Sequence, residues 1–189
     1  MGQISIKGEV KAPVDRIFGF VDDHRNTTRY MKGLTRWSPT TDVVHGKGAE
    51  FEVVMKAGPA SLRSVVRITG WSENRSIAWR AIEGFAQSGR WAFSPRGDQT
   101  TVTLDMEYEF GGGIAGRMLG RAAEPAVRHN LEQSVATLKE LTEKLRRAPI
   151  KSGPAKPSAV HPAKPKTPGA RSAGAASRAG AGSRRPPAR

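Results

Sequence analysis

The sequence contains no cysteine, which excludes disulfide bonds, thiolate catalysis and cysteine-bound metal sites. Its four histidines, His24, His45, His129 and His161, are scattered, and no two of them stand at the spacing of zinc ligands. No apolar run approaches the roughly 18 residues that a membrane-spanning helix needs. The first residues also lack the apolar core of a signal peptide. We therefore expect no metal, no cofactor and a cytoplasmic location.

Acidic residues are absent from the last part of the chain. Residues 1–146 hold 21 Lys and Arg side chains and all 17 acidic ones, whereas residues 147–189 hold 10 basic side chains and no acid. This last stretch consists of Lys-Pro, Ala-Gly and Ser-Arg runs that offer almost no apolar surface to bury. We predict a globular domain over residues 1–148 and a disordered basic tail over 149–189. The tail is either a solubilising segment or a weak, salt-sensitive contact for nucleic acid or an anionic membrane.

The beginning of the chain predicts one strand followed by two short helices. Residues 3–10 alternate between apolar and polar side chains, as a strand with one buried face does. Pro13 suits the first position of a helix. The apolar face of that helix would consist of Val14, Ile17, Phe18 and Val21. A second short helix is expected over residues 27–31.

From about residue 35 to residue 110, strand-like segments alternate with turn residues. The last segment is the clearest, because apolar side chains occupy every second position from Val102 to Phe110. The segment 37–44 fits less well: it needs a bulge, and Pro39 indicates an edge strand.

Neighbouring strands can be paired so that their apolar faces coincide, because a slip of one residue would turn a strand inside out. This pairing places Val53 opposite Val66, Ile68 opposite Ile77, Trp79 opposite Gly89, and Trp91 opposite Leu104. On the outer face it places Glu52 opposite Arg67 and Arg90 opposite Asp105, and these opposite charges favour the pairing.

A long helix follows the glycines at 111–113. Its apolar stripe has helical spacing and consists of Val127, Leu131, Val135, Leu138, Leu141 and Leu145. Pro125 interrupts the stretch, so residues 114–124 are expected to kink away or to form a separate segment.

The order of these elements and several short segments resemble a known superfamily. The segments are VKAPVDRIF at 10–18, GWSENRSIAWR at 70–80, SGRWAFSP at 88–95, GGGIAG at 111–116 and NLEQSV at 130–135. The chain resembles the helix-grip superfamily, which includes START lipid-transfer domains, the birch-pollen allergen group and bacterial polyketide cyclase/dehydrase-like proteins. The resemblance covers residues 3–146. It implies an α+β fold in which a curved antiparallel sheet of about seven strands wraps around a long C-terminal helix.

The resemblance also implies an apolar cavity between the sheet and the long helix. On the inner face of the expected sheet, the candidate ligand-binding residues are Val53, Met55, Ser64, Val66, Trp79, Gln87, Trp91, Leu104, Met106 and Tyr108, with Met118 from the helix. The polar members Ser64, Gln87 and Tyr108 would lie near the mouth, beside the 111–113 glycines. A mostly apolar lining with few polar groups is typical of ligand sites. Each of these residues could equally be ordinary core.

Three functions remain open at this point. The first is binding, and in some form transport, of a hydrophobic small molecule such as a lipid, an isoprenoid or a polyketide-like compound. The second is a cyclase or dehydratase that acts on a ligand in the same cavity by holding it in a reactive shape. The third is an interaction module that the basic tail tethers to polyanions. We assign no catalytic residue, because no nucleophile, phosphate-loop or metal pattern is present and the carboxylates of the last strand face outward.

Overall fold

The computed structural model describes residues 1–57 and 60–147. The tail expected over 149–189 and the turn expected at residues 58–59 lie outside the described residues. The strands are β1 (Gly2–Val10), β2 (Leu34–Pro39), β3 (Glu50–Ala57), β4 (Ala60–Ser72), β5 (Ser76–Gly84), β6 (Ala86–Arg96) and β7 (Gln99–Glu109). The helices are α1 (Val14–Asp22), the 3-10 helix η1 (His24–Asn26), α2 (Thr27–Tyr30) and α3 (Gly113–Arg147).

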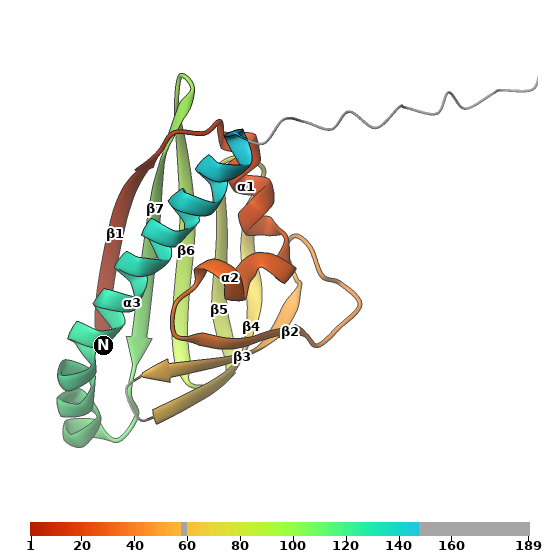
Figure 1. Cartoon of the computed structure of the whole chain (residues 1–189). Helices are drawn as coiled ribbons and strands as arrows, with labels where there is room; N and C mark the ends of the chain where they lie inside the picture. The colour runs from red at the N-terminus through yellow and green to blue at the C-terminus, as the bar shows by residue number, and fades with distance from the viewer. Residues whose placement is uncertain (58–59, 148–189) are drawn as a thin grey trace, which may run out of the picture. The chain divides into compact units, whose positions relative to one another are not determined.

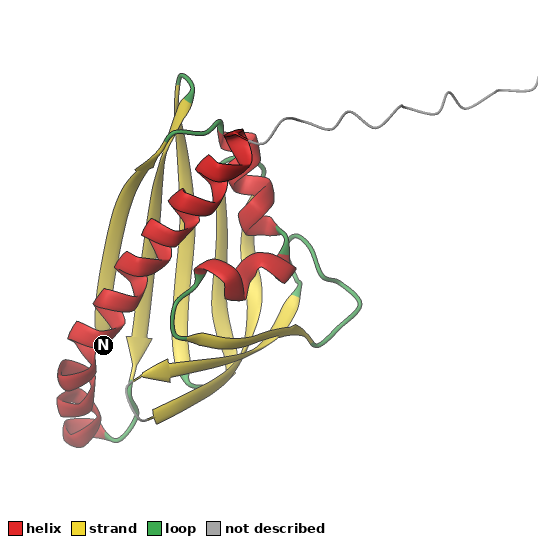
Figure 2. Cartoon of the chain, in the orientation of Figure 1, coloured by secondary structure: helices red, strands yellow, loops and turns green. Residues whose placement is uncertain are grey.

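All of these strands form one antiparallel sheet in the order β1-β7-β6-β5-β4-β3-β2. The sheet is curved, and α3 runs across one of its faces (Figure 1). Figure 2 shows that the short helices cover the same face, beside α3. The sequence-based prediction of a helix-grip α+β fold is therefore confirmed. The predicted edge strand with a bulge is also present, since β2 lies at the edge of the sheet, ends at Pro39 and has a register shift between Leu34 and Arg36. Its predicted bounds, 37–44, are wrong, because residues 40–44 belong to the connection that follows β2.

The core lies between the sheet and α3. Val127, Leu131, Val135 and Leu138 form the buried stripe of the helix, as its spacing predicted. A close approach between α3 and β1 depends on Gly8, because a Cβ atom there would lie 2.6 Å from the Val135 Cγ1 atom. Each such apolar side chain stabilises the fold by about 1.5–3 kcal/mol when fully buried.

The predicted register is correct for one half of the sheet and wrong for the other. Trp79 faces Gly89, and Arg90 faces Asp105, as expected. In the other half, however, Val66 faces Phe51 rather than Val53, and Ile68 faces Trp79 rather than Ile77. The expected pairs Val53–Val66, Ile68–Ile77 and Glu52–Arg67 are thus wrong by two residues.

The physical reason is that a shift of two residues keeps every side chain on its own face, so the alternating pattern cannot detect it. In addition, the pairing of β4 with β5 contains two register shifts, which bulges in a curved sheet produce. The charges follow the true register. Arg67 pairs with Glu50 at 2.7 Å, and Glu52 pairs with Arg36 at 3.1 Å.

Helix α3 continues through Pro125 as one helix of 35 residues. The separate segment expected before Pro125 is therefore not formed. Figure 1 shows that the first turns of α3 run in a different direction from the rest of the helix. Such a bend is the usual consequence of an internal proline, which lacks the N–H for one helical hydrogen bond.

Candidate functional site: an aromatic cavity beside the short helices

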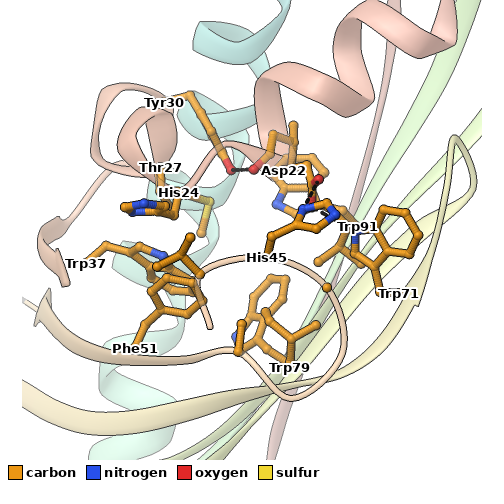
Figure 3. Close-up of a pocket in the computed structure, with 17 residues that line it drawn as sticks. Asp22, His24, Thr27, Tyr30, Trp37, His45, Phe51, Trp71, Trp79 and Trp91 are labelled. Carbon is orange, nitrogen blue, oxygen red and sulfur yellow. Dashed lines mark hydrogen bonds and ion pairs between the residues drawn. The ribbon is translucent and has the colours of Figure 1, made fainter. Parts of the chain in front are cut away.

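A cavity lies between the sheet and the segment that contains α1, η1 and α2. The connection between β2 and β3, residues 40–49, closes it on one side through Val44, His45 and Gly46. Figure 3 shows Trp79 and Phe51 on the sheet side of the cavity and Tyr30, Thr27 and His24 on the helix side. Its volume, about 50 Å³, is room for a few water molecules but not for a whole lipid.

The lining is aromatic to an unusual degree. All four tryptophans of the chain, Trp37, Trp71, Trp79 and Trp91, line this cavity. They come from four different strands: β2, β4, β5 and β6. Tryptophan is a large side chain with an apolar body and one N–H donor, and it is common where proteins hold flat apolar ligands.

The rings are arranged in pairs. Trp37 stacks on Phe51 with ring centroids 5.0 Å apart, and His24 lies 5.7 Å from the same Phe51 ring. Across the cavity, Tyr30 meets Trp91 edge to face at 5.9 Å. Stacked and edge-to-face pairs hold aromatic side chains in fixed orientations. Much of the wall therefore consists of flat ring faces and edges, which Met31 and several branched aliphatic side chains complete.

One carboxylate organises the rim of the cavity. Asp22, the last residue of α1, accepts a hydrogen bond from Trp71 Nε1 at 2.8 Å through its Oδ1 atom. Its Oδ2 atom lies 2.8 Å from His45 Nδ1 (Figure 3). The His45 ring also packs edge to face on Trp71, at 5.1 Å. This Asp22–Trp71–His45 cluster joins α1, β4 and the 40–49 connection.

Two further polar atoms belong to the cavity wall. The Tyr30 hydroxyl donates to the Val21 carbonyl at 3.4 Å. Burial holds the pKa of Tyr30 far above its ordinary value of 10.0, although the Thr27 side chain opposes this shift, so the phenol stays a neutral donor. The indole Nε1 of Trp37 is buried and has no hydrogen-bond partner among the described residues. A buried donor without a partner costs free energy that a ligand acceptor would recover.

The structure brings together only part of the ligand-binding set predicted from the sequence. Trp79 and Trp91 line the cavity. Val53, Val66 and Leu104 are fully buried in the core. Met55 and Met106 border two narrow voids of about 20 and 10 Å³ next to α3.

The cavity mouth predicted from the sequence does not coincide with the aromatic cavity. At the predicted mouth, Gln87 donates to Ser64 Oγ at 2.8 Å, and Tyr108 is buried opposite Gln87 in the sheet. Two open hollows of about 280 and 270 Å³ flank Tyr108 on the surface. Met118 lines neither the aromatic cavity nor the voids beside α3, and 67% of its surface is exposed.

Sequence reasoning did not find Trp37, Trp71, Asp22 and His45 as site residues. The only signal for the first two was the small number of tryptophans in the chain. Asp22 and His45 carried none, because a helix end and a turn are usual places for such residues. Within the described residues, no group of three or more His, Asp or Glu side chains is placed to hold a metal ion.

A curved antiparallel sheet that wraps around a long C-terminal helix, with two short helices after the first strand, defines the helix-grip fold. Residues 1–143 match the family described as "Polyketide cyclase / dehydrase and lipid transport". The chain belongs to this family. Among the curated proteins, none matches the sequence.

Solved structures share the fold at low sequence identity. A protein of Thermus thermophilus is 21% identical with a TM-score of 0.66, and the match covers 76% of this chain and 99% of that one. A START superfamily protein from Mycobacterium smegmatis is 19% identical with a TM-score of 0.61, over 76% and 98% of the two chains. The Zhui aromatase/cyclase from a Streptomyces species is 17% identical with a TM-score of 0.62, over 80% and 98%. At these identities the likeness establishes the fold alone.

Among the described residues, no helix is long and apolar enough to cross a membrane.

Proposed function

We propose that this chain binds a hydrophobic small molecule of the lipid, isoprenoid or polyketide kind in the aromatic cavity, and that it carries this molecule rather than converting it. The observation that supports the proposal is the gathering of all four tryptophans around one cavity. Their ring faces suit a flat or unsaturated ligand, and the free Trp37 N–H suits a carbonyl or hydroxyl oxygen on it.

The cavity has to widen before it holds such a molecule, because about 50 Å³ is far below the volume of a typical ligand site. Met31 borders both the aromatic cavity and the void that Met55 and Met106 line. A longer ligand would therefore extend from the tryptophans toward α3 along these methionines. Methionine is unbranched and adapts its shape readily, so this direction opens at low cost.

The test is a titration of the full chain with N-phenyl-1-naphthylamine, a neutral dye of fused and single aromatic rings. Because every tryptophan lines the cavity, bound dye should quench tryptophan emission and emit by energy transfer, with saturation at one dye per chain. Native mass spectrometry of the purified, folded chain should detect a bound apolar compound. A solvent extract of the same protein should contain that compound.

Two variants separate a cavity from ordinary core. Ala49 is fully buried and lines the cavity, so Ala49→Met should reduce dye binding with little loss of stability. Val66 is fully buried in the core, so Val66→Met should cost about 1–3 kcal/mol through overpacking. The proposal fails if the parent chain shows no saturable dye binding and both variants lose the same stability.

The alternative function is a cyclase or dehydratase of the polyketide type, and the Asp22–His45 contact at the rim is the observation that favours it. An imidazole oriented by a carboxylate can remove a proton from a carbon between two carbonyl groups, and the resulting enolate can attack a carbonyl further along the chain. Turnover of a linear poly-β-ketone that His45→Gln abolishes, with dye binding retained, would establish this activity. The tether to polyanions and the cytoplasmic location expected from the sequence stay predictions.

A further inference from the structure

The first turns of α3 expose apolar side chains that a helix normally buries. Ile114 is 70% exposed, Met118 is 67% exposed and Leu119 is 56% exposed. Most large apolar side chains of the described residues are buried or half-buried, whereas these three exposed ones lie within six consecutive positions. Single exposed apolar residues are normal on a protein surface, but a cluster of three requires an explanation.

The helix has no room to turn this cluster inward. Gly116 faces the body of the protein, where a Cβ atom would lie 2.3 Å from the carbonyl oxygens of Phe110 and Gly111. Gly120, one turn later, faces the Phe110 ring. At 100° per residue, Ile114 and Met118 then point to the opposite side, away from the domain. The small residues therefore fix the direction of Ile114 and Met118, and the exposed Leu119 lies about 100° further around the helix from Met118.

Basic residues flank the exposed cluster on one side of the helix. Arg117, Arg121 and Arg128 succeed one another at helical spacing and are exposed. Arg128 lies 3.8 Å from Glu124, whereas neither Arg117 nor Arg121 forms an ion pair with another described residue. Met1, 80% exposed, lines the same surface hollow as Arg117 and Arg121. Apolar side chains beside a row of arginines are the pattern of an interfacial helix.

We propose that this surface, formed by Ile114, Met118, Leu119, Arg117 and Arg121, docks on an anionic lipid bilayer. The apolar side chains would enter the boundary between headgroups and acyl chains, while the guanidinium groups contact lipid phosphates. Three side chains are too few for a stable protein interface, which buries about 800 Å² on each partner. A bilayer accepts such a small insertion when basic residues add to it. The proposal is independent of which molecule the aromatic cavity holds.

The experiment uses the absence of cysteine from the chain, which lets one engineered thiol carry a fluorophore at a single site. Met118→Cys is labelled with an environment-sensitive dye in the full chain, and Ile82→Cys, 45% exposed on β5, serves as the control. With vesicles of phosphatidylcholine and phosphatidylglycerol, the label at 118 should shift to the blue and be quenched by brominated lipid. The label at 82 should do neither.

Charge is tested separately from insertion. Arg117→Gln with Arg121→Gln should lower the partition coefficient on these vesicles by about 30-fold, since one basic residue near an anionic surface is worth roughly 5-fold. On vesicles of pure phosphatidylcholine the same pair should change little. The matched control, Arg75→Gln with Arg96→Gln, removes two exposed arginines elsewhere and should have a much smaller effect.

Three results would overturn the proposal. The first is a label at 118 that stays unchanged when the protein sediments with vesicles, because another basic part of the chain then makes the contact. The second is an equal loss of binding in both arginine pairs. The third is a blue shift at 118 that grows with protein concentration without lipid, because a second copy of the chain would then cover the surface.

Discussion

We expect that the cavity stays closed because the Asp22 carboxylate binds two side chains at its rim. Its Oδ1 accepts the Trp71 N–H and its Oδ2 lies against His45, both at 2.8 Å. The side chain of Asp22 is only 15% exposed, whereas that of His45 is 62% exposed. The Trp71 bond therefore matters most, since a hydrogen bond to a charged group contributes about 1.5–3 kcal/mol and an exposed ion pair well under about 1 kcal/mol.

Asp22→Ala should consequently lower the free energy of unfolding by about 1.5–2 kcal/mol, at the lower end because the site is partly solvated. One opposing effect reduces this loss. Asp22 stands at the C-terminal end of α1, where a negative charge is unfavourable by about 0.3–1 kcal/mol, and its removal recovers that amount. Urea unfolding followed by far-ultraviolet circular dichroism measures the net change.

A double-mutant cycle with Trp71→Phe isolates the hydrogen bond, because the helix-end effect is the same in both backgrounds and cancels. Trp71→Phe removes the N–H but keeps an aromatic ring against Phe18, whose ring centroid lies 5.6 Å away. We expect a coupling energy of about 1–1.5 kcal/mol. If the two losses add to within about 0.3 kcal/mol, the carboxylate does not hold Trp71, and this account of the rim is wrong.

Three other predictions concern the interior. Gly89→Ala would place a Cβ atom 2.3 Å from the Trp79 ring, so we expect a loss of about 1–3 kcal/mol and a change in tryptophan emission; an unchanged urea midpoint would mean that Trp79 moves freely. Tyr108→Phe removes a buried hydroxyl that has no partner among the described residues, so stability should stay the same or rise by up to about 1 kcal/mol in the same assay. Burial raises the pKa of both tyrosines of the chain above 10.0, and that of Tyr30 far above it, so the absorbance of tyrosinate should develop at a higher pH than in the unfolded chain. Each tyrosine has a higher pKa in the folded than in the unfolded chain, so the stability that comes from keeping the phenols neutral is complete below about pH 10 and is lost as the pH rises further. Titration of both tyrosines near pH 10 in the folded chain would contradict this.

The fold was predictable because its main signals are local and periodic. Alternation along β7 identifies its buried face from Val102 to Tyr108, and the 3.6-residue stripe from Val127 to Leu138 identifies the buried side of α3. Pro13, predicted at the first position of the first helix, lies one residue before it, as the N-cap of α1. None of these features depends on a distant partner, so the sequence alone was sufficient for the order of elements.

The register of β3 with β4 was not predictable, and this had a consequence for the site. The true pairing sets Phe51 opposite Val66, two positions from the expected partner. Phe51 there stacks on Trp37 of β2 and lies against His24 of η1. These contacts join segments that are distant in the sequence. Their relative positions depend on how the short helices fold back over the sheet, which no local pattern predicts. Of the cavity residues, only Trp79 and Trp91 were found; they lie on β5 and β6, whose pairing with each other was predicted correctly.

If the cavity binds a ligand as proposed, its small volume and the structure of the 40–49 connection lead us to expect that the ligand enters past this connection. The connection covers the cavity with Val44 and His45, yet Val43 and Val44 are 52% and 38% exposed, so little apolar surface fixes it in place. Gly46 and Gly48 have positive φ angles of 75° and 97°, which glycine adopts without strain and which allow the backbone other conformations. The Asp22–His45 contact is then the main polar tie between this segment and α1. We expect Asp22→Ala to increase the rate of dye association, because it frees both His45 of the connection and the Trp71 side chain of the wall. An unchanged association rate in a folded Asp22→Ala variant would show that the ligand enters elsewhere, and the voids beside α3 at Met55 and Met106 would become the next route to test.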